Sequence, residues 1–415
     1  MAITLENPAR KFTLSAVLAL AALQFLFSAR DFAAFQLAQS DEPSRLQLAA
    51  RLAPGNADYQ YRMGKLLGFV QNDPAAALPF YRAAVFLNPH IARYWLDLAA
   101  AYQVDGNSSG QRDAIENAVR ANPTNPDVAW EAGNFFLVQG DNDLAFRQLS
   151  MVLENQPNMA GLVLQLCWRA SPDVDNLLAR VVPNTVEANL AFLQFLMSKK
   201  DPDGAAKVWQ RIVDMRCPFD RRNLFEYIKF LISDHRVDQA RLVWQQAASP
   251  LGLSAYVPSS NLIVNARFDL DVLNGGFDWN YRVQRGVTLT LDPTQFHVGH
   301  RSLSIVFEGE GINDAGVHQL VPVEGNKTYE FSAFYKSEDI QGAGGPVFAV
   351  RDLYSGQSYF ISEELKHSDG EWKQVEGTFT TTPDSRLLIV LIERNPAGNT
   401  IRGRLWVDDF DLGLK

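Results

Sequence analysis

The chain has 415 residues, too many for one ordinary compact domain, so at least two domains are expected. Apolar residues make up 47% and charged residues 20%, a balance that supports packed cores and excludes disorder over most of the chain. The formal net charge of −9 argues against sequence-independent binding to nucleic acid, because such binding needs a basic face.

The N-terminal segment is apolar. Arg10 and Lys11 precede a run over residues 12–29 that is close in length to the roughly 20 residues a helix needs to cross a bilayer. Positive charge on that side favours a cytoplasmic N-terminus. We therefore expect residues 1–35 to form an uncleaved, single-pass anchor in the cytoplasmic membrane, with the rest of the chain extracytoplasmic, either periplasmic or extracellular. A cleavable signal peptide is the alternative, and the bulky Phe27 disfavours it.

Prolines recur at a fixed interval after this segment. Pro54 lies 35 residues before Pro89, and Pro89, Pro123 and Pro157 are each 34 residues apart. A 34-residue period ending in proline is typical of stacked helical hairpins. Small residues such as Gly133 stand where paired helices approach closely. Residues 158–183 are shorter than the period, and the segments up to Pro250 keep only helical periodicity.

Residues 42–250 therefore resemble the tetratricopeptide repeat (TPR) family. The resemblance implies a superhelix whose first helices line a groove that binds a protein partner. Aligned on the prolines, the groove residues are Tyr61, Arg93, Leu96, Trp130 and Asn134. Packing between the paired helices is the other interpretation of Trp130.

Two cysteines, Cys167 and Cys217, stand outside any C-x-x-C pair, in apolar surroundings. Two cysteines cannot form a disulfide framework and fall short of a structural zinc site. Both are interpreted as small buried hydrophobic residues.

The character of the sequence changes near Pro250. Residues 251–260 have a linker composition, and from Asn261 onward short alternating segments are separated by turn residues, which predicts an antiparallel β-sandwich over residues 261–415. The predicted strands are 287–291, 303–307, 317–323, 328–335, 347–351, 376–381, 387–392 and 405–412.

Six motifs follow one another in this second part: 261–269 (NLIVNARFD), 276–279 (GFDW), 297–303 (HVGHRSL), 329–337 (YEFSAFYKS), Trp372 with Phe379, and 405–410 (LWVDDF). In this order they resemble jelly-roll carbohydrate-binding modules and the wider galactose-binding-like sandwiches. Ala266 and Asp269 depart from the family's usual Gly and Glu. The resemblance implies glycan binding.

Candidate glycan-binding residues lie around one loop. Tyr354 and Tyr359 flank Ser355 and Gly356, and sugar C–H faces stack on aromatic rings; Arg351 and Asp352 stand beside them as partners for hydroxyl groups. The family resemblance also suggests a structural Ca²⁺ held by Asp269 and Asp409, for which surface salt links are the alternative.

The sequence holds no G-x-S-x-G, no H-E-x-x-H, no phosphate-binding loop and no dinucleotide fingerprint. We therefore expect no enzyme but a membrane-tethered adaptor, with repeats binding a protein and a sandwich binding a glycan. Its domain combination suggests a role in envelope or exopolysaccharide assembly. A structural scaffold without sugar affinity, or an accessory subunit of a polysaccharide-acting enzyme, is the alternative.

Overall fold

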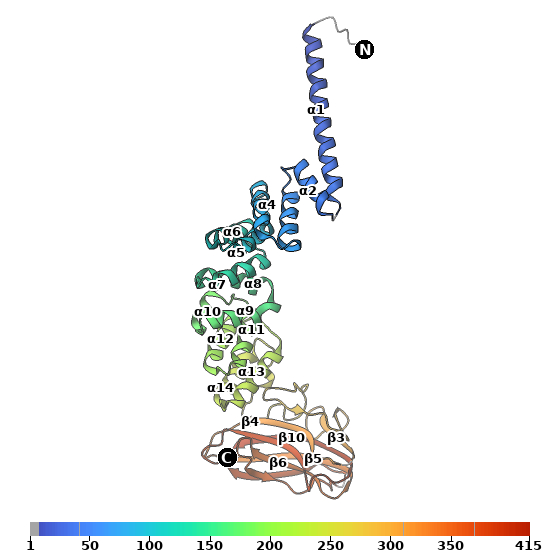
Figure 1. The fold of residues 1–415 in the computed structure, drawn as a ribbon. Helices are drawn as coiled ribbons and strands as arrows, with labels where there is room; N and C mark the ends of the chain where they lie inside the picture. Colours follow the sequence, from blue (N-terminus) through green and yellow to red (C-terminus); the bar gives the residue numbers. More distant parts are fainter. Residues whose placement is uncertain (1–7, 41, 310, 369) are drawn as a thin grey trace. The chain divides into compact units, whose positions relative to one another are not determined.

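The computed structural model describes residues 8–40, 42–309, 311–368 and 370–415, so residues 1–7 of the predicted anchor lie outside it. Helices make up the N-terminal part and two antiparallel sheets the C-terminal part, which confirms the predicted fold class (Figure 1). The chain divides into two compact units, Met1–Ala191 and Phe192–Lys415. The second unit joins the last helices to the sandwich.

The helices are short except for the first. In chain order they are α1 (Pro8–Ala38), α2 (Pro43–Leu52), α3 (Ala57–Lys65), α4 (Pro74–Leu87), α5 (Ala92–Val104), α6 (Ser108–Ala121), α7 (Pro126–Val138), α8 (Asn142–Asn155), α9 (Ala160–Ala170), α10 (Val174–Arg180), α11 (Val186–Ser198), α12 (Pro202–Met215), α13 (Arg221–Ser233) and α14 (Val237–Ala248), with a π-helical turn at Leu66–Val70 and 3-10 turns at Pro157–Met159 and Ser254–Tyr256.

Helix α1 is long and apolar enough to cross a membrane. Its stretch Lys11–Ala38 has a mean hydropathy of 1.9, and the rest of the protein buries none of its most apolar part. Only its C-terminal end packs on the repeats, where Ala34 and Ala38 are buried against Leu46 and Ala49 of α2. Length and composition fit a membrane span and a signal sequence equally.

Successive hairpins of the first unit follow the predicted period. Helices α4, α6 and α8 end within two residues of Pro89, Pro123 and Pro157. At Gly64 an added Cβ would lie 2.8 Å from the ring of Tyr81, and at Gly133 it would lie 2.8 Å from Leu149. These glycines allow the paired helices to approach closely. The shortened repeat is also confirmed, since α10 has only 7 residues.

The last helices contact the sandwich directly within the second unit. The indole of Trp244 in α14 donates a hydrogen bond to the carbonyl of Tyr256 (3.0 Å), and the Tyr256 hydroxyl donates to the carbonyl of Asp271 (2.7 Å). Gly276, at φ +63°, leaves room for the Trp244 ring, because a Cβ there would lie 2.2 Å from it. Within residues 251–260, predicted as a linker, Leu253 and Tyr256 are buried.

The two cysteines differ from each other. Cys167 in α9 is buried as predicted, and burial raises its pKa to about 12. Cys217 is exposed, so the prediction of a buried residue was wrong there. Helix α12 ends at Met215, and Arg216 adopts a left-handed conformation, so Cys217 lies beyond the helix.

The sandwich consists of two five-stranded antiparallel sheets among the described residues. Sheet A has the order β1-β4-β9-β6-β7 and sheet B the order β2-β3-β10-β5-β8. The strands are β1 (Asn280–Tyr281), β2 (Val287–Asp292), β3 (Ser302–Gly309), β4 (Asp314–Pro322), β5 (Thr328–Gly342), β6 (Gly345–Asp352), β7 (Ser358–Ile361), β8 (Lys373–Thr380), β9 (Leu387–Asn395) and β10 (Ile401–Leu414).

The predicted strands are all present, but the alternating pattern noted from Asn261 onward forms no strand before β1 at Asn280. Residues 261–279 form turns and bends, since Asn265, Phe268 and Asn274 adopt positive φ angles that interrupt an extended chain. This irregular segment still pairs with the last strand: Leu262 N donates to Leu412 O, and Phe410 N donates to Ala266 O.

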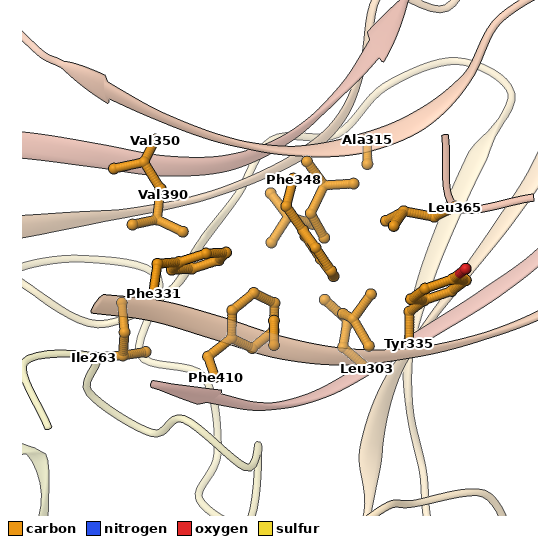
Figure 2. Packing of buried hydrophobic residues seen from close by; sticks show 14 of the residues in the cluster. Ile263, Leu303, Ala315, Phe331, Tyr335, Phe348, Val350, Leu365, Val390 and Phe410 are labelled. Atoms are coloured by element: carbon orange, nitrogen blue, oxygen red, sulfur yellow. The ribbon is translucent and has the colours of Figure 1, made fainter. Parts of the chain in front are cut away.

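Aromatic side chains fill the space between the sheets. Figure 2 shows Phe348 and Val390 of sheet A facing Phe331 and Phe410 of sheet B. The Phe348 and Phe410 rings meet edge to face, with centroids 5.3 Å apart. Alternate residues of each strand enter this core, so the residues between them point outward.

We predict that Gly133→Ala destabilises the helical repeats by about 1–3 kcal/mol, because the new methyl group overlaps Leu149 in a packed core. Gly161→Ala in α9 is the matched control, since nothing lies within 4 Å of its added Cβ. Thermal unfolding followed by circular dichroism measures both. Equal melting temperatures for the two variants would contradict the close helix approach.

Candidate functional site

The four predicted glycan-binding residues lie at one end of sheet A. Arg351 and Asp352 end β6, Tyr354 lies in the following turn, and Tyr359 is in β7. The structure therefore brings them together as the sequence suggested, but each side chain already has partners within the protein.

Asp352 organises the turn. It is 4% exposed, and its carboxylate accepts hydrogen bonds from Ser355 N (2.8 Å), Tyr354 N (3.0 Å) and Ser385 Oγ (2.6 Å). Burial by itself would raise the pKa of Asp352, but the hydrogen bonds from Ser355 and Ser385 outweigh it, so the pKa is lowered. The carboxylate is thus ionised and surrounded by protein donors.

The two tyrosines are packed. The Tyr354 hydroxyl donates to the carbonyl of Ile232 in α13 (2.9 Å), and its ring stacks on His235 with centroids 4.1 Å apart. Tyr359 stacks on Phe379 at 5.5 Å, and its hydroxyl lies 2.6 Å from Ser385 Oγ. A sugar-stacking role for either ring stays a prediction. In the structure both rings pack against other aromatic side chains of the protein, Tyr354 against His235 and Tyr359 against Phe379.

Arg351 belongs to a mixed surface on the outer side of sheet A. Its guanidinium lies 2.5 Å from the carboxylate of Glu393 in β9, with the side chains 37% and 18% exposed. Glu393 is the cross-strand partner of Asp314 in β4, which pairs with Arg282. Half-buried Leu320, Ile389 and Leu391 lie beside these ion pairs on the same side. We call this surface the Arg351 face.

His318 of β4 lies on the same face, where it is the cross-strand partner of Leu391 in β9. Burial lowers its pKa, Arg282 adds to that effect, and Asp314 opposes it. A histidine with a lowered pKa is neutral near pH 7, so its ring can both donate and accept a hydrogen bond. Sequence reasoning missed His318 and Glu393, although His318 lies within a predicted strand and Glu393 directly follows one.

The predicted Ca²⁺ ligands Asp269 and Asp409 both have partners within the protein. Asp409 accepts a hydrogen bond from Arg267 Nε (2.9 Å), and its other oxygen lies 3.3 Å from His297 Nδ1. Asp269 accepts the backbone N–H of His300 (2.7 Å). No group of three or more His, Cys, Asp or Glu that could hold a metal occurs in the described ranges. The ion pair of Asp409 with Arg267 is a salt link of the kind given as the alternative, and Ca²⁺ at Asp269 and Asp409 stays a prediction from the family resemblance.

The predicted protein-binding residues fall into two clusters. Around Asp97, which is 4% exposed, Tyr61 donates its hydroxyl proton (2.7 Å) and Arg93 forms an ion pair (2.9 Å). Burial and the Asp97 charge raise the pKa of Tyr61 to about 12. Leu96 and Asn134 line a separate cavity of about 270 Å³ between α5 and α7.

Trp130 is half-buried and does not line that cavity; its carbonyl accepts a hydrogen bond from Asn134 Nδ2 (2.8 Å). Its interpretation as a groove residue or a packing residue stays open. In either role it belongs to the same helix as Asn134.

Comparison with known proteins gives one family for the sandwich. Residues 260–398 match the family model of a carbohydrate binding domain. No curated protein matches the chain.

Solved structures give weaker likenesses. The CBM22-1 xylan-binding domain of Paenibacillus barcinonensis Xyn10C is 21% identical, over 36% of this chain and 91% of that one, with a TM-score of 0.25. A structure described as "CBM4 structure and function" is 16% identical over 37% and 99%, with a TM-score of 0.29. A MamA crystal structure is 14% identical over 45% and 90%, with a TM-score of 0.28. TM-scores this low carry no argument about fold or function. The likeness of residues 260–398 to the carbohydrate binding domain family therefore rests on the family model.

We predict that Tyr354→Ala lowers the stability of the second unit by about 1–3 kcal/mol, because it removes the stacking on His235 and the hydrogen bond to Ile232. Tyr354→Phe keeps the ring and should cost less. Thermal unfolding of both variants checks this. A Tyr354→Ala protein that melts like the parent but binds glycan more weakly would instead support the sugar-stacking role.

Proposed function

We propose that this chain is a non-catalytic binding protein whose sandwich binds a glycan. The match of residues 260–398 to a carbohydrate binding domain is the observation that carries this proposal. The Arg351 face supplies suitable chemistry, because its half-buried apolar residues accept the C–H faces of a sugar and its ion pairs hydrogen-bond the hydroxyl groups.

The remainder of the chain supports an adaptor role. Helix α1 fits a membrane tether, and the helical hairpins with their α5–α7 cavity fit a protein partner. TPR membership, an extracytoplasmic location and a role in envelope or exopolysaccharide assembly belong to this proposal. The alternatives are a scaffold without sugar affinity and an accessory subunit of a polysaccharide-acting enzyme.

Glycan binding is tested with the full chain in detergent, by affinity measurements against soluble and insoluble polysaccharides. Arg351→Ala should weaken binding about tenfold, since hydrogen bonds to a charged group contribute about 1.5–3 kcal/mol and 1.4 kcal/mol is one decade. Thr378→Ala, exposed on sheet B, is the control and should bind like the parent.

A folded chain that binds no polysaccharide would favour the scaffold alternative. Hydrolysis of any polysaccharide in the same assays would favour an enzymatic role. Binding lost on chelation would support the predicted Ca²⁺ near Asp269 and Asp409.

Membrane tethering predicts that the full chain fractionates with membranes and needs detergent for release, whereas residues 42–415 alone are recovered in the soluble fraction. Immunoblotting of the fractions and N-terminal sequencing check this. Soluble full-length product trimmed near Ala29 would show a cleaved signal sequence instead.

A further inference from the structure

A polar groove crosses the outer side of sheet B, on the side of the sandwich away from the Arg351 face. One cavity of about 730 Å³ is lined by β5 and β10 together with the segments that follow β2 and precede β8. A second cavity of about 480 Å³ continues it toward β3. The two share Glu338, Asp339 and Arg404, so they form one continuous groove.

Strand register places side chains from three strands on the groove floor. Arg404 of β10 is the cross-strand partner of Glu338 in β5 and of Val306 in β3, and Trp406 is the partner of Lys336. The register shifts at Gly403, where an added Cβ would lie 2.4 Å from the carbonyl oxygen of Asp339. Such a bulge redirects neighbouring side chains, and here it turns Asp339 toward the same groove.

The floor carries charged groups that the protein itself leaves available. Arg404 lies over the Trp406 ring at 5.4 Å, and the indole N–H donates to Asp292 (2.9 Å), which fixes the ring. Within the described parts of the chain, Arg404, Glu338 and Arg402 form no ion pair, although Arg404 and Glu338 are direct cross-strand partners and both are exposed. Oppositely charged residues that face each other across two strands without forming an ion pair are available to a ligand.

Both signs of charge alternate along the groove, with Lys336 and Arg404 next to Glu338 and Glu308. A polyanion would meet carboxylates there, and a polycation would meet guanidinium groups. A chain of hydroxyl groups, each of which donates and accepts, suits this mixture. We propose that the groove binds an uncharged oligosaccharide, as a second glycan site distinct from the Arg351 face.

Two sites on opposite sides of one sandwich have a functional consequence. A domain with both can hold two glycan chains at once, or one branched polymer at two points, and so gains avidity for an insoluble polysaccharide. The groove does not depend on the Arg351 face, since no residue is shared between them.

The test uses the full chain in detergent with four uncharged probes: cellohexaose, xylohexaose, mannohexaose and chitohexaose. Titration calorimetry compares the parent with Arg404→Ala and Glu338→Ala in the groove, and with Arg351→Ala on the other face. Glu330→Ala is the matched control, because Glu330 is exposed on the same side of β5 but outside the groove. Melting temperatures confirm that each variant folds.

We expect a hexasaccharide to bind with an affinity that both groove variants weaken at least about tenfold, while Arg351→Ala and Glu330→Ala leave this event unchanged. Raising salt from about 0.05 to about 0.5 M should change it less than twofold, since an uncharged ligand is not screened. Quenching of Trp fluorescence by the probe, lost in Trp406→Phe, should accompany it.

Groove variants that bind every probe like the parent would overturn the groove, and so would a folded parent chain that binds none of them. Binding abolished only by Arg351→Ala would overturn the groove and retain the proposed function. Binding abolished only by the groove variants would retain the groove and refute the Arg351 face. Binding to the groove that falls steeply with salt would show a charged ligand and also overturn this proposal.

Discussion

The edge-to-face contact of Phe348 with Phe410 between the two sheets constrains everything else in the sandwich. Because side chains alternate along a strand, fixing these two rings inward also fixes which neighbours point to solvent. Arg351 and Glu393 then lie on the outer side of sheet A, and Arg404 and Glu338 on the outer side of sheet B. A slip of one residue in any central strand would bury these charges, so register and candidate chemistry are specified together.

The same alternation explains how far the sequence could predict the fold. Strands β3 and β9 were found within three residues of their ends, whereas the predictions for the longest strands, β5 and β10, fell short by up to seven residues. Strands β1 and β7 were missed because they contain 2 and 4 residues, too few to show a period. The repeats were predictable for another reason: a proline that ends a helix marks the chain locally and needs no knowledge of distant partners.

The candidate site was less predictable, because its contacts join residues far apart in sequence. Tyr354 meets Ile232 across 122 positions, and Arg267 meets Asp409 across 142. From the sequence alone, Tyr354 is expected to be exposed because it lies in a loop near a glycine. Only the fold shows that it contacts the C-terminal end of α13. Arg351 was found because it stands beside the loop tyrosines Tyr354 and Tyr359 in the sequence. Glu393 and His318 stand beside no such aromatic pair, but each is a polar residue at an outward position of an apolar strand pattern and was recoverable by alternation.

Trp244 packs against Gly276 and donates a hydrogen bond to the backbone of Tyr256. This contact limits how the sandwich can be combined with other domains. Binding domains that recombine often in evolution are usually joined by flexible linkers, where a change of neighbouring domain does not disturb the fold. Here the Trp244 side chain of α14 packs against the sandwich. A recombination point near residue 255 would therefore expose the Trp244 indole on the helical part and leave a cavity beside Gly276 on the sandwich. A sandwich moved to another protein would therefore need α14 with it, because Trp244 of that helix packs against the sandwich residue Gly276.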